Sequence, residues 1–210
     1  MKYFKTYEEK IAKPSSFLIL LGVLKGYLNK PLIILIITKI TFKKFKRKVK
    51  LELPADFIDN YAFIAWLYIR LKRKVGHEKA FEILRAGILT SGLAVQQANF
   101  RNVEAGRSFD NLKRYQQKAN REGSTKLNSI EIIEETDHKF EFRVTRCLFF
   151  ELFNSLDVQE LTSIMCSIDN AIFNSYLPER IVFHRNGLYK TIFHGNKYCE
   201  FVLENKDLLH

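Results

Sequence analysis

The hydrophobic period of this chain changes near residue 129, and this change sets the class of fold that the chain can adopt. Before that point apolar residues recur at helical spacing, which predicts helices over residues 55–74, 78–98 and 109–121. After it, the segments "SIEIIEET" and "KFEFRVTR" alternate apolar and polar residues, as antiparallel strands do when one face is buried. The chain is therefore expected to combine helices with a sheet.

Helical spacing returns after Arg146 and interrupts the strands. It predicts a short helix that begins near residue 148 and a longer one over residues 158–176. Three more strands are predicted in "RIVFHR", "YKTIFH" and "KYCEFVLE", with Gly195-Asn196 as a hairpin turn between the last two. We predict an α+β fold in which N-terminal helices precede an antiparallel sheet, with a helical insertion packed on one sheet face.

Positive charge is concentrated in the first quarter of the chain. Residues 1–50 hold 13 Lys and Arg but 2 Asp and Glu, whereas residues 51–210 hold 21 of each kind. The net charge of +11 therefore belongs to the first segment. We predict a basic apolar helical segment over residues 1–50 and an α+β domain over residues 51–210. A basic stretch of this kind attracts phosphate on lipid headgroups, nucleic acid or a phosphorylated partner.

The basic segment contains two apolar runs, residues 17–24 and 32–37, and both are too short to span a bilayer. They predict two short helices, the first capped by Ser15 or Ser16 and the second beginning near Pro31. One interpretation is a pair of core helices with a solvated basic end. The other is a helix lying on an anionic membrane, with "KKFKRK" at the headgroups. Nucleic acid is disfavoured, because no recognisable nucleic-acid-binding motif surrounds the basic run.

The three cysteines predict reduced thiols in a cytoplasmic protein, because their number is odd and a chain of this size needs no disulfides. The N-terminus is too polar and acidic for a secretory signal peptide. The middle of the chain contains no phosphate loop, dinucleotide fingerprint or HExxH motif. These observations give no indication of a nucleotide-binding or zinc-protease activity.

Two of the cysteines are followed by an acid about one helical turn later. Cys147 precedes Glu151 and Cys166 precedes Asp169, so each pair shares a helix face. Cys199 lies on the apolar face of the last predicted strand. Spacing alone favours inert core thiols, because free cysteine is among the most buried residue types. A zinc site would be favoured by a CxxC pair or neighbouring histidines, and the sequence has neither.

The alternation of residues in one predicted strand indicates a buried cation. In "RIVFHR" the alternation places Arg185 on the same face as Ile181 and Phe183. An inward arginine is rarely tolerated unless it is paired. The two cysteine–acid pairs and this arginine could therefore converge on one concave site.

Four segments taken in order, "RCLFFELF", "QELTSIMCSID", "IVFHRN" and "TIFHGNKYCEF", resemble the L-2-amino-thiazoline-4-carboxylic acid hydrolase family. That family shows RCxxxE, then PELxxxFCxxD, FxRxxT and GxxxCxF, and the likeness covers residues 139–203. Gln159 replaces the family's proline, and "NGLYK" lengthens the spacing between Arg185 and Thr191. The matching residues are Arg146, Cys147, Glu151, Glu160, Leu161, Cys166, Asp169, Phe183, Arg185, Thr191, Gly195, Cys199 and Phe201.

The resemblance implies a small hydrolase that adds water at the amidine-like C=N carbon of a thiazoline ring. It implies Cys147 or Cys166 as the nucleophile, with Asp169 or Glu151 activating the thiol or a water. The rival mechanism that it leaves open is a water activated by a divalent metal, manganese or zinc, held by the cysteines and Asp169.

The resemblance also implies a substrate pocket. Arg185 would hold a substrate carboxylate through a bidentate pair, and Thr191 and Cys199 would line the same pocket. The basic segment 1–50 suggests a substrate that is lipid-like or carried by a partner protein. Two other functions remain open: a non-catalytic module that binds a small molecule or lipid, and an accessory protein of a biosynthetic pathway. The second would be peripheral at an anionic membrane surface.

Overall fold

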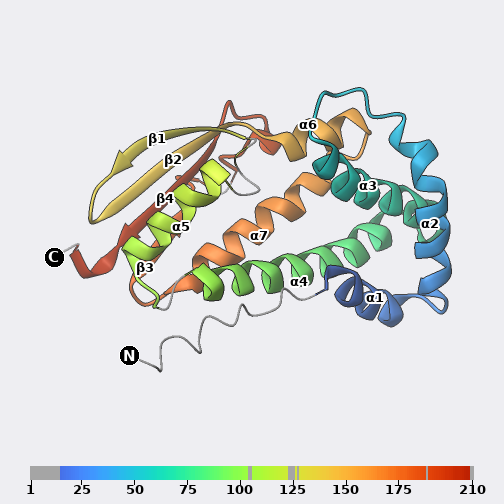
Figure 1. The fold of residues 1–210 in the computed structure, drawn as a ribbon, viewed down its shortest axis with the longest axis horizontal. Helices are drawn as coiled ribbons and strands as arrows, with labels where there is room; N and C mark the ends of the chain where they lie inside the picture. The colour runs from blue at the N-terminus through green and yellow to red at the C-terminus, as the bar shows by residue number, and fades with distance from the viewer. Residues whose placement is uncertain (1–14, 104–105, 123–125, 127, 188, 209–210) are drawn as a thin grey trace. The chain divides into compact units, whose positions relative to one another are not determined.

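The computed structural model describes residues 15–103, 106–122, 126, 128–187 and 189–208, so part of the predicted basic segment lies outside the described residues. Helices come first and strands later, as the change of period predicts (Figure 1). The helices are α1 (Ser16–Tyr27), α2 (Pro31–Lys46), α3 (Ala55–Val75), α4 (His77–Val103), α5 (Phe109–Glu122), α6 (Leu148–Ser155) and α7 (Leu161–Tyr176). The strands are β1 (Ser129–Glu135), β2 (Lys139–Arg146), β3 (Ile181–His184) and β4 (Cys199–Asn205), with 3-10 turns η2 (Ile192–His194) and η3 (Lys206–Leu208).

The described chain forms two compact units. The sheet unit comprises Leu93–Leu148 and Ile168–His210, and the helical unit comprises Pro14–Gly92 and Phe149–Ser167. The long helices α4 and α7 each contribute residues to both units. The predicted division of the chain at residue 50 stays a prediction.

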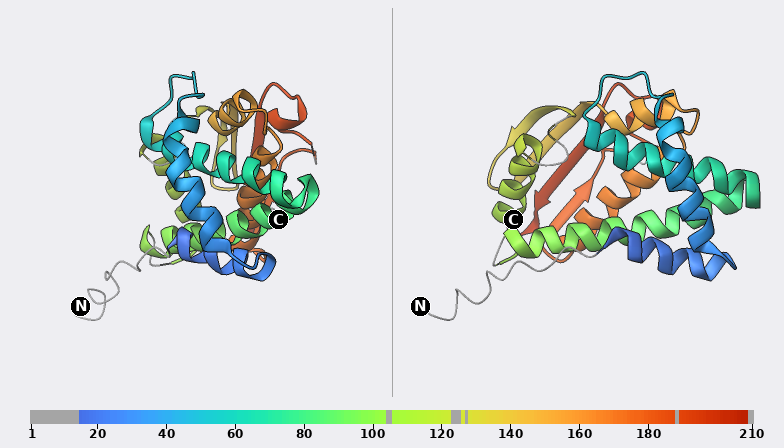
Figure 2. Two further views of the ribbon diagram at one scale, coloured as in Figure 1. Left: turned by 90° about the vertical axis from the view of Figure 1, so that its right-hand side faces the viewer. Right: turned by 45° about the vertical axis from the view of Figure 1, so that its right-hand side comes forward.

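The helical unit begins with two short helices whose limits agree with the sequence. Ser15 caps α1 by accepting a hydrogen bond from the backbone N–H of Leu18 at 3.4 Å, and Pro31 occupies the first turn of α2. Helix α2 packs across α3 (Figure 2). Phe45 of α2 stacks on Trp66 of α3 with 4.6 Å between the ring centroids. This contact fixes one face of α2 against α3.

A buried tyrosine connects α3 to the residue before α7 inside the helical unit. The Tyr68 hydroxyl is fully buried and donates a hydrogen bond to the Glu160 carboxylate at 2.9 Å. Lys72 Nζ lies 3.8 Å from the same carboxylate. Burial, followed by the hydrogen bond and charge of Glu160, raises the pKa of Tyr68 above its usual range. Glu160, one of the residues shared with the family pattern, therefore has a structural partner.

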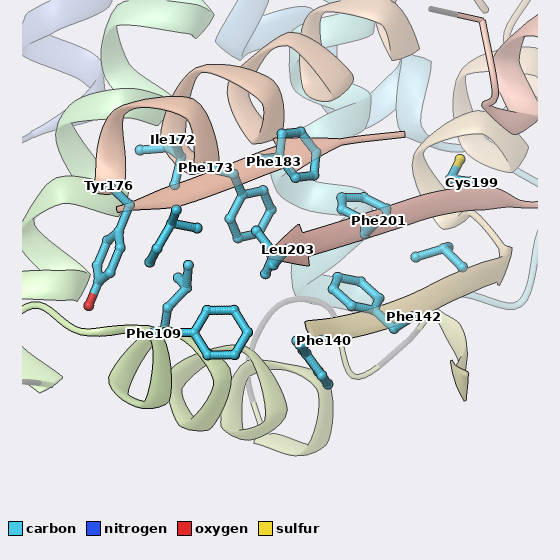
Figure 3. Packing of buried hydrophobic residues seen from close by; sticks show 13 residues of the cluster. Phe109, Phe140, Phe142, Ile172, Phe173, Tyr176, Phe183, Cys199, Phe201 and Leu203 are labelled. Carbon is cyan, nitrogen blue, oxygen red and sulfur yellow. The ribbon is translucent and has the colours of Figure 1, made fainter. Parts of the chain in front are cut away.

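The sheet unit is built on an antiparallel sheet of order β1-β2-β4-β3. Phe142 of β2 pairs with Phe201 of β4, and their rings stack at 4.6 Å. One face of the sheet is covered by α5 and the sheet-unit part of α7, and the buried side chains between them form the core (Figure 3). This core consists of Phe109, Leu112, Phe140, Phe142, Val144, Ile172, Phe173, Tyr176, Ile181, Phe183, Cys199, Phe201 and Leu203. The predicted α+β class is confirmed.

The opposite face of the sheet has a ladder of charged side chains. Glu200 is 4% exposed and accepts hydrogen bonds from Arg143 Nη2 at 2.9 Å and from Asn186 Nδ2 at 2.9 Å. Burial by itself raises the pKa of Glu200, but the bonds from Asn186 and Arg143 together outweigh it and the pKa is lowered. Glu200 is therefore held as a carboxylate by its partners.

The predicted strand "YKTIFH" is wrong, and so is the Gly195-Asn196 hairpin. Residues 192–194 form the 3-10 turn η2, which Gly195 ends in the left-handed conformation at φ +85°. The reason is that β4 already pairs with β2 on one side and β3 on the other. The segment bonds to itself instead, with Asn196 Nδ2 donating to the backbone oxygen of Thr191 at 3.2 Å.

Two predicted helix ends also differ from the structure. Helix α4 continues to Val103 rather than ending at residue 98, and α7 begins at Leu161 rather than at residue 158. Asp157 has a positive φ of 57°, which interrupts helical geometry just before that point. The remaining predicted helices and the strand over residues 139–146 agree closely with α3, α5 and β2.

Candidate functional site

Arg185 follows the last residue of β3, and its side chain turns into the core of the sheet unit. It is 7% exposed, and its guanidinium carbon lies 4.0 Å from the centroid of the Phe201 ring and 5.6 Å from that of Phe183. The alternation along β3 places Arg185 on the same face as Phe183. The predicted inward orientation of the arginine is confirmed.

Two neighbouring polar residues on α7 contact this guanidinium. Arg185 Nε donates a hydrogen bond to Asn170 Oδ1 at 2.8 Å, and Nη2 lies 3.5 Å from Asp169 Oδ2. Within the described part of the chain, neither Nη1 nor Nη2 of Arg185 has a hydrogen-bond acceptor, although both atoms are buried. A guanidinium stays charged in proteins, and burying its N–H groups without acceptors is costly. Two donor nitrogens of a buried cation are therefore left without an acceptor among the described residues.

The Asp169 carboxyl has a raised pKa, which lies close to neutral pH. Desolvation raises the pKa of Asp169 to about 6, against the opposing charge of the Arg185 guanidinium. Protein atoms crowd the carboxyl, yet 43% of the side chain remains exposed, so water offsets part of the desolvation. A carboxyl of this kind can give or take a proton near neutrality.

Cys199 lies at one end of the row of core side chains in Figure 3, with Phe201 and Phe183 next along it. It is 6% exposed, and its sulfur accepts a hydrogen bond from the backbone N–H of Ile192 at 3.2 Å. Burial raises the pKa of Cys199 in spite of that bond and of the Arg185 charge. The side chain is therefore a neutral thiol, and its role in substrate binding stays a prediction.

Thr191 is buried in the connection between β3 and β4, and its hydroxyl lies 2.7 Å from His194 Nδ1. Cys147 follows β2 and is partly buried against the same core that contains Cys199. These positions place both residues in the sheet unit with Arg185. A direct contact of Thr191 with substrate and a nucleophilic role for Cys147 stay predictions.

Glu151 and Cys166 belong to the helical unit. Glu151 lies in the first turn of α6, and Cys166 is partly buried on α7, one turn before Asp169. Their catalytic roles also stay predictions. No three of the described His, Cys, Asp and Glu side chains are grouped so that they could hold a metal ion.

Asn170 is the site residue that the sequence reasoning missed. Its Oδ1 accepts the hydrogen bond from Arg185 Nε and so orients the guanidinium. The two terminal nitrogens of Arg185 are left without acceptors among the described residues. A signal was present, because "DN" in "CSIDNAIF" places two adjacent residues with hydrogen-bonding side chains between the apolar Ile168 and Ala171. Helical periodicity assigned only the first of them to a functional face.

Comparison with known proteins gives one match. The model of the L-2-amino-thiazoline-4-carboxylic acid hydrolase family matches residues 57–203, which include most of α3, helices α4 to α7, strands β1 to β3 and most of β4. Arg185, Asp169 and the three cysteines all fall inside the matched range. No curated protein and no solved structure matches the chain.

Proposed function

Because this chain belongs to the L-2-amino-thiazoline-4-carboxylic acid hydrolase family, we propose that it opens a small cyclic substrate by adding water at an amidine-like C=N carbon. The substrate carries a carboxylate, and Arg185 binds it. Asp169 exchanges the proton that ring opening requires. Cys147 or Cys166 supplies the attacking sulfur.

The proposal rests on the state of the Arg185 side chain. Nη1 and Nη2 are buried and have no hydrogen-bond acceptor among the described residues, while Asn170 holds Nε in place. Two terminal N–H groups in one plane match the two oxygens of a carboxylate. A substrate carboxylate would remove the cost of the unpaired donors, so binding energy would be concentrated at this residue.

The chemistry can be written for a 2-amino-thiazoline ring. The nucleophile adds to the carbon between the ring nitrogen and sulfur, and the C=N electron pair moves to the nitrogen, which takes a proton from Asp169. The C–S bond of the ring then breaks, and the sulfur leaves as a thiolate that takes a proton. With water as the nucleophile, its two protons end on the ring nitrogen and on the sulfur, one of them passed through Asp169, and its oxygen becomes the carbonyl of a carbamoyl product with a free thiol.

A cysteine nucleophile divides the same reaction into two steps. The thiolate of Cys147 or Cys166 displaces the ring sulfur and becomes bonded to the amidine carbon. Water then adds to that carbon, and the bond to the cysteine sulfur breaks. One water is consumed, as in the direct route, so product analysis does not distinguish the two routes. Trapping the covalent intermediate on one cysteine does.

The test is thiol release from 2-amino-thiazoline-4-carboxylate by the full-length protein, with and without added manganese or zinc. Arg185→Lys keeps the charge but loses the two-pronged geometry, and we expect the KM to rise about 10- to 100-fold. Arg180→Lys is the matched control, because Arg180 is an exposed arginine at the start of β3 that pairs with Asp207.

A second substrate separates carboxylate binding from other effects. 2-Amino-thiazoline lacks the carboxylate, so it should be a poor substrate for the wild type and should lose nothing further in Arg185→Lys. Equal KM values for the acid in wild type and variant would refute the assignment of Arg185. Saturable binding of the acid without thiol release under any condition would favour the non-catalytic binding module instead.

A further inference from the structure

Helix α2 exposes a continuous apolar stripe on the side that α3 does not cover. Leu32, Ile33, Ile36, Ile37 and Ile40 are 48%, 50%, 55%, 39% and 74% exposed. Their spacing places them on one face of the helix. On the other face Ile34, Leu35 and Phe45 are buried. The helix is therefore apolar on two sides, and one of them faces solvent in the described structure.

This stripe is a contiguous surface rather than scattered exposure. Single exposed aliphatic side chains are ordinary, but contiguous apolar patches on a monomer mark surfaces that bind something. Helix α1 also exposes two apolar side chains, Phe17 and Leu18, which are 52% and 65% exposed. Both helices lie before residue 57, outside the range that matches the hydrolase family. The stripe is therefore not explained by the proposed reaction.

Positive charge borders the stripe at both ends. Residues 15–50 contain nine Lys and Arg and no Asp or Glu. Helical geometry places Lys43 and Arg47 on the same face, one and two turns beyond Ile40, and both are exposed. At the other end, Lys25 and Lys30 line a shallow depression together with Leu32. The surface thus combines aliphatic side chains with a cationic border.

We propose that this face of α2 docks on the surface of an anionic lipid bilayer. The aliphatic stripe enters the boundary between headgroups and acyl chains, and the lysines contact lipid phosphates. Two copies of the face would bring cationic borders of like charge together, which disfavours self-association. Among the described residues no helix is long and apolar enough to cross a bilayer, so α2 lies along the surface.

Vesicle sedimentation tests the proposal with the full-length protein. We expect binding to vesicles of phosphatidylcholine with phosphatidylglycerol, and at least about tenfold weaker binding to phosphatidylcholine alone. Ile36→Ser with Ile40→Ser should weaken binding to the anionic vesicles at least about tenfold, because two aliphatic side chains that would enter the bilayer are lost. Lys43→Gln with Lys44→Gln should weaken it about fivefold for each lysine.

A matched control removes equally exposed isoleucines elsewhere. Ile132 and Ile133 of β1 are 47% and 44% exposed, so Ile132→Ser with Ile133→Ser makes the same chemical change away from α2. This control should bind like the wild type. Unchanged thermal unfolding of the α2 variants would show that they fold, since isoleucine and serine have similar helix propensities.

Three results would overturn the proposal. These are no binding of the wild type to anionic vesicles, equal loss in the β1 control, or full binding by the Ile36→Ser, Ile40→Ser variant. Gel filtration of the wild type without lipid tests the other possible occupant of the stripe, a second copy of the chain. A dimer that the α2 variants convert to monomer, without vesicle binding by either form, would assign the stripe to a second copy of the chain instead.

Discussion

Arg185 Nη2 and Asp169 Oδ2 lie 3.5 Å apart in the sheet unit, one from the end of β3 and the other from α7. This ion pair satisfies the guanidinium only in part, because Nη1 and Nη2 still have no hydrogen-bond acceptor among the described residues. A buried charge whose partner only partly satisfies it is expensive to maintain. This cost is the basis of the carboxylate-binding role proposed for Arg185.

Arg185→Met should separate stability from binding. Removing one member of a buried pair is costly when the other stays buried and charged, but the Asp169 side chain is 43% exposed to water, so the Tm should fall only slightly. Binding of the thiazoline acid should be lost, because no donor remains for its carboxylate. Calorimetric unfolding and titration with the acid check both parts. A large fall in Tm would show instead that the guanidinium is structural.

Asp169→Asn should change how stability depends on pH. The pKa of Asp169 is raised in the folded state, so its protonated form favours folding at low pH, and this contribution is lost as the pH rises from about 4 to about 6. The difference in unfolding free energy, wild type minus variant, should fall across that window and stay constant above it. Urea unfolding at a series of pH values measures the difference. A difference that rises with pH would contradict the raised pKa.

Arg143→Met should destabilise the sheet unit, because it leaves the buried Glu200 carboxylate with Asn186 as its remaining partner among the bonds described above. We expect the midpoint of thermal unfolding to fall by several degrees at neutral pH. The loss should shrink as the pH falls, since the lowered pKa of Glu200 contributes stability only while the group is ionised. Arg180→Met, in the exposed pair with Asp207, should leave the midpoint nearly unchanged.

Tyr68→Phe should destabilise the helical unit. It removes the hydroxyl that donates to Glu160 and leaves the ring in place, so we expect a loss of about 1–2 kcal/mol in unfolding free energy. Tyr189→Phe makes the same change on a ring that is 67% exposed and should have little effect. Denaturant titration of both variants measures the difference, and equal stabilities would show that the Tyr68 contact is not stabilising.

Cys199 should be the slowest of the three thiols to react in the folded protein. Its pKa is raised by burial and its side chain is 6% exposed, whereas Cys147 and Cys166 are partly buried. Timed alkylation with iodoacetamide near pH 8, read by peptide mass spectrometry, gives the order of reaction. Unfolding the protein should make all three rates similar. Fast modification of Cys199 in the folded protein would contradict its placement in the core.

Local patterns predicted most elements, because each depended on residues close in the sequence. The capping serine before α1 and the proline that starts α2 both act within one helical turn. The alternation in β2 gave its core face correctly for the same reason. The inward orientation of Arg185 also followed from alternation alone.

The failures involve residues whose environment depends on distant segments. "YKTIFH" alternates like a strand, but β4 has neighbours on both sides, and no local pattern reveals that the sheet is already complete there. Sequence periodicity likewise placed Asp169 on a functional face but did not pair Asn170 with Arg185, fifteen residues later.

The sequence by itself determined most of the helix and strand types, the basic apolar character of the first fifty residues and the family to which residues 57–203 belong. Only the tertiary structure decided that the Arg185 donors remain without acceptors and that the isoleucines of α2 face outward rather than into a core. The physical reason is that hydrogen-bond satisfaction and solvent exposure are properties of the whole surroundings of a group. Those surroundings come from segments that the local sequence does not specify.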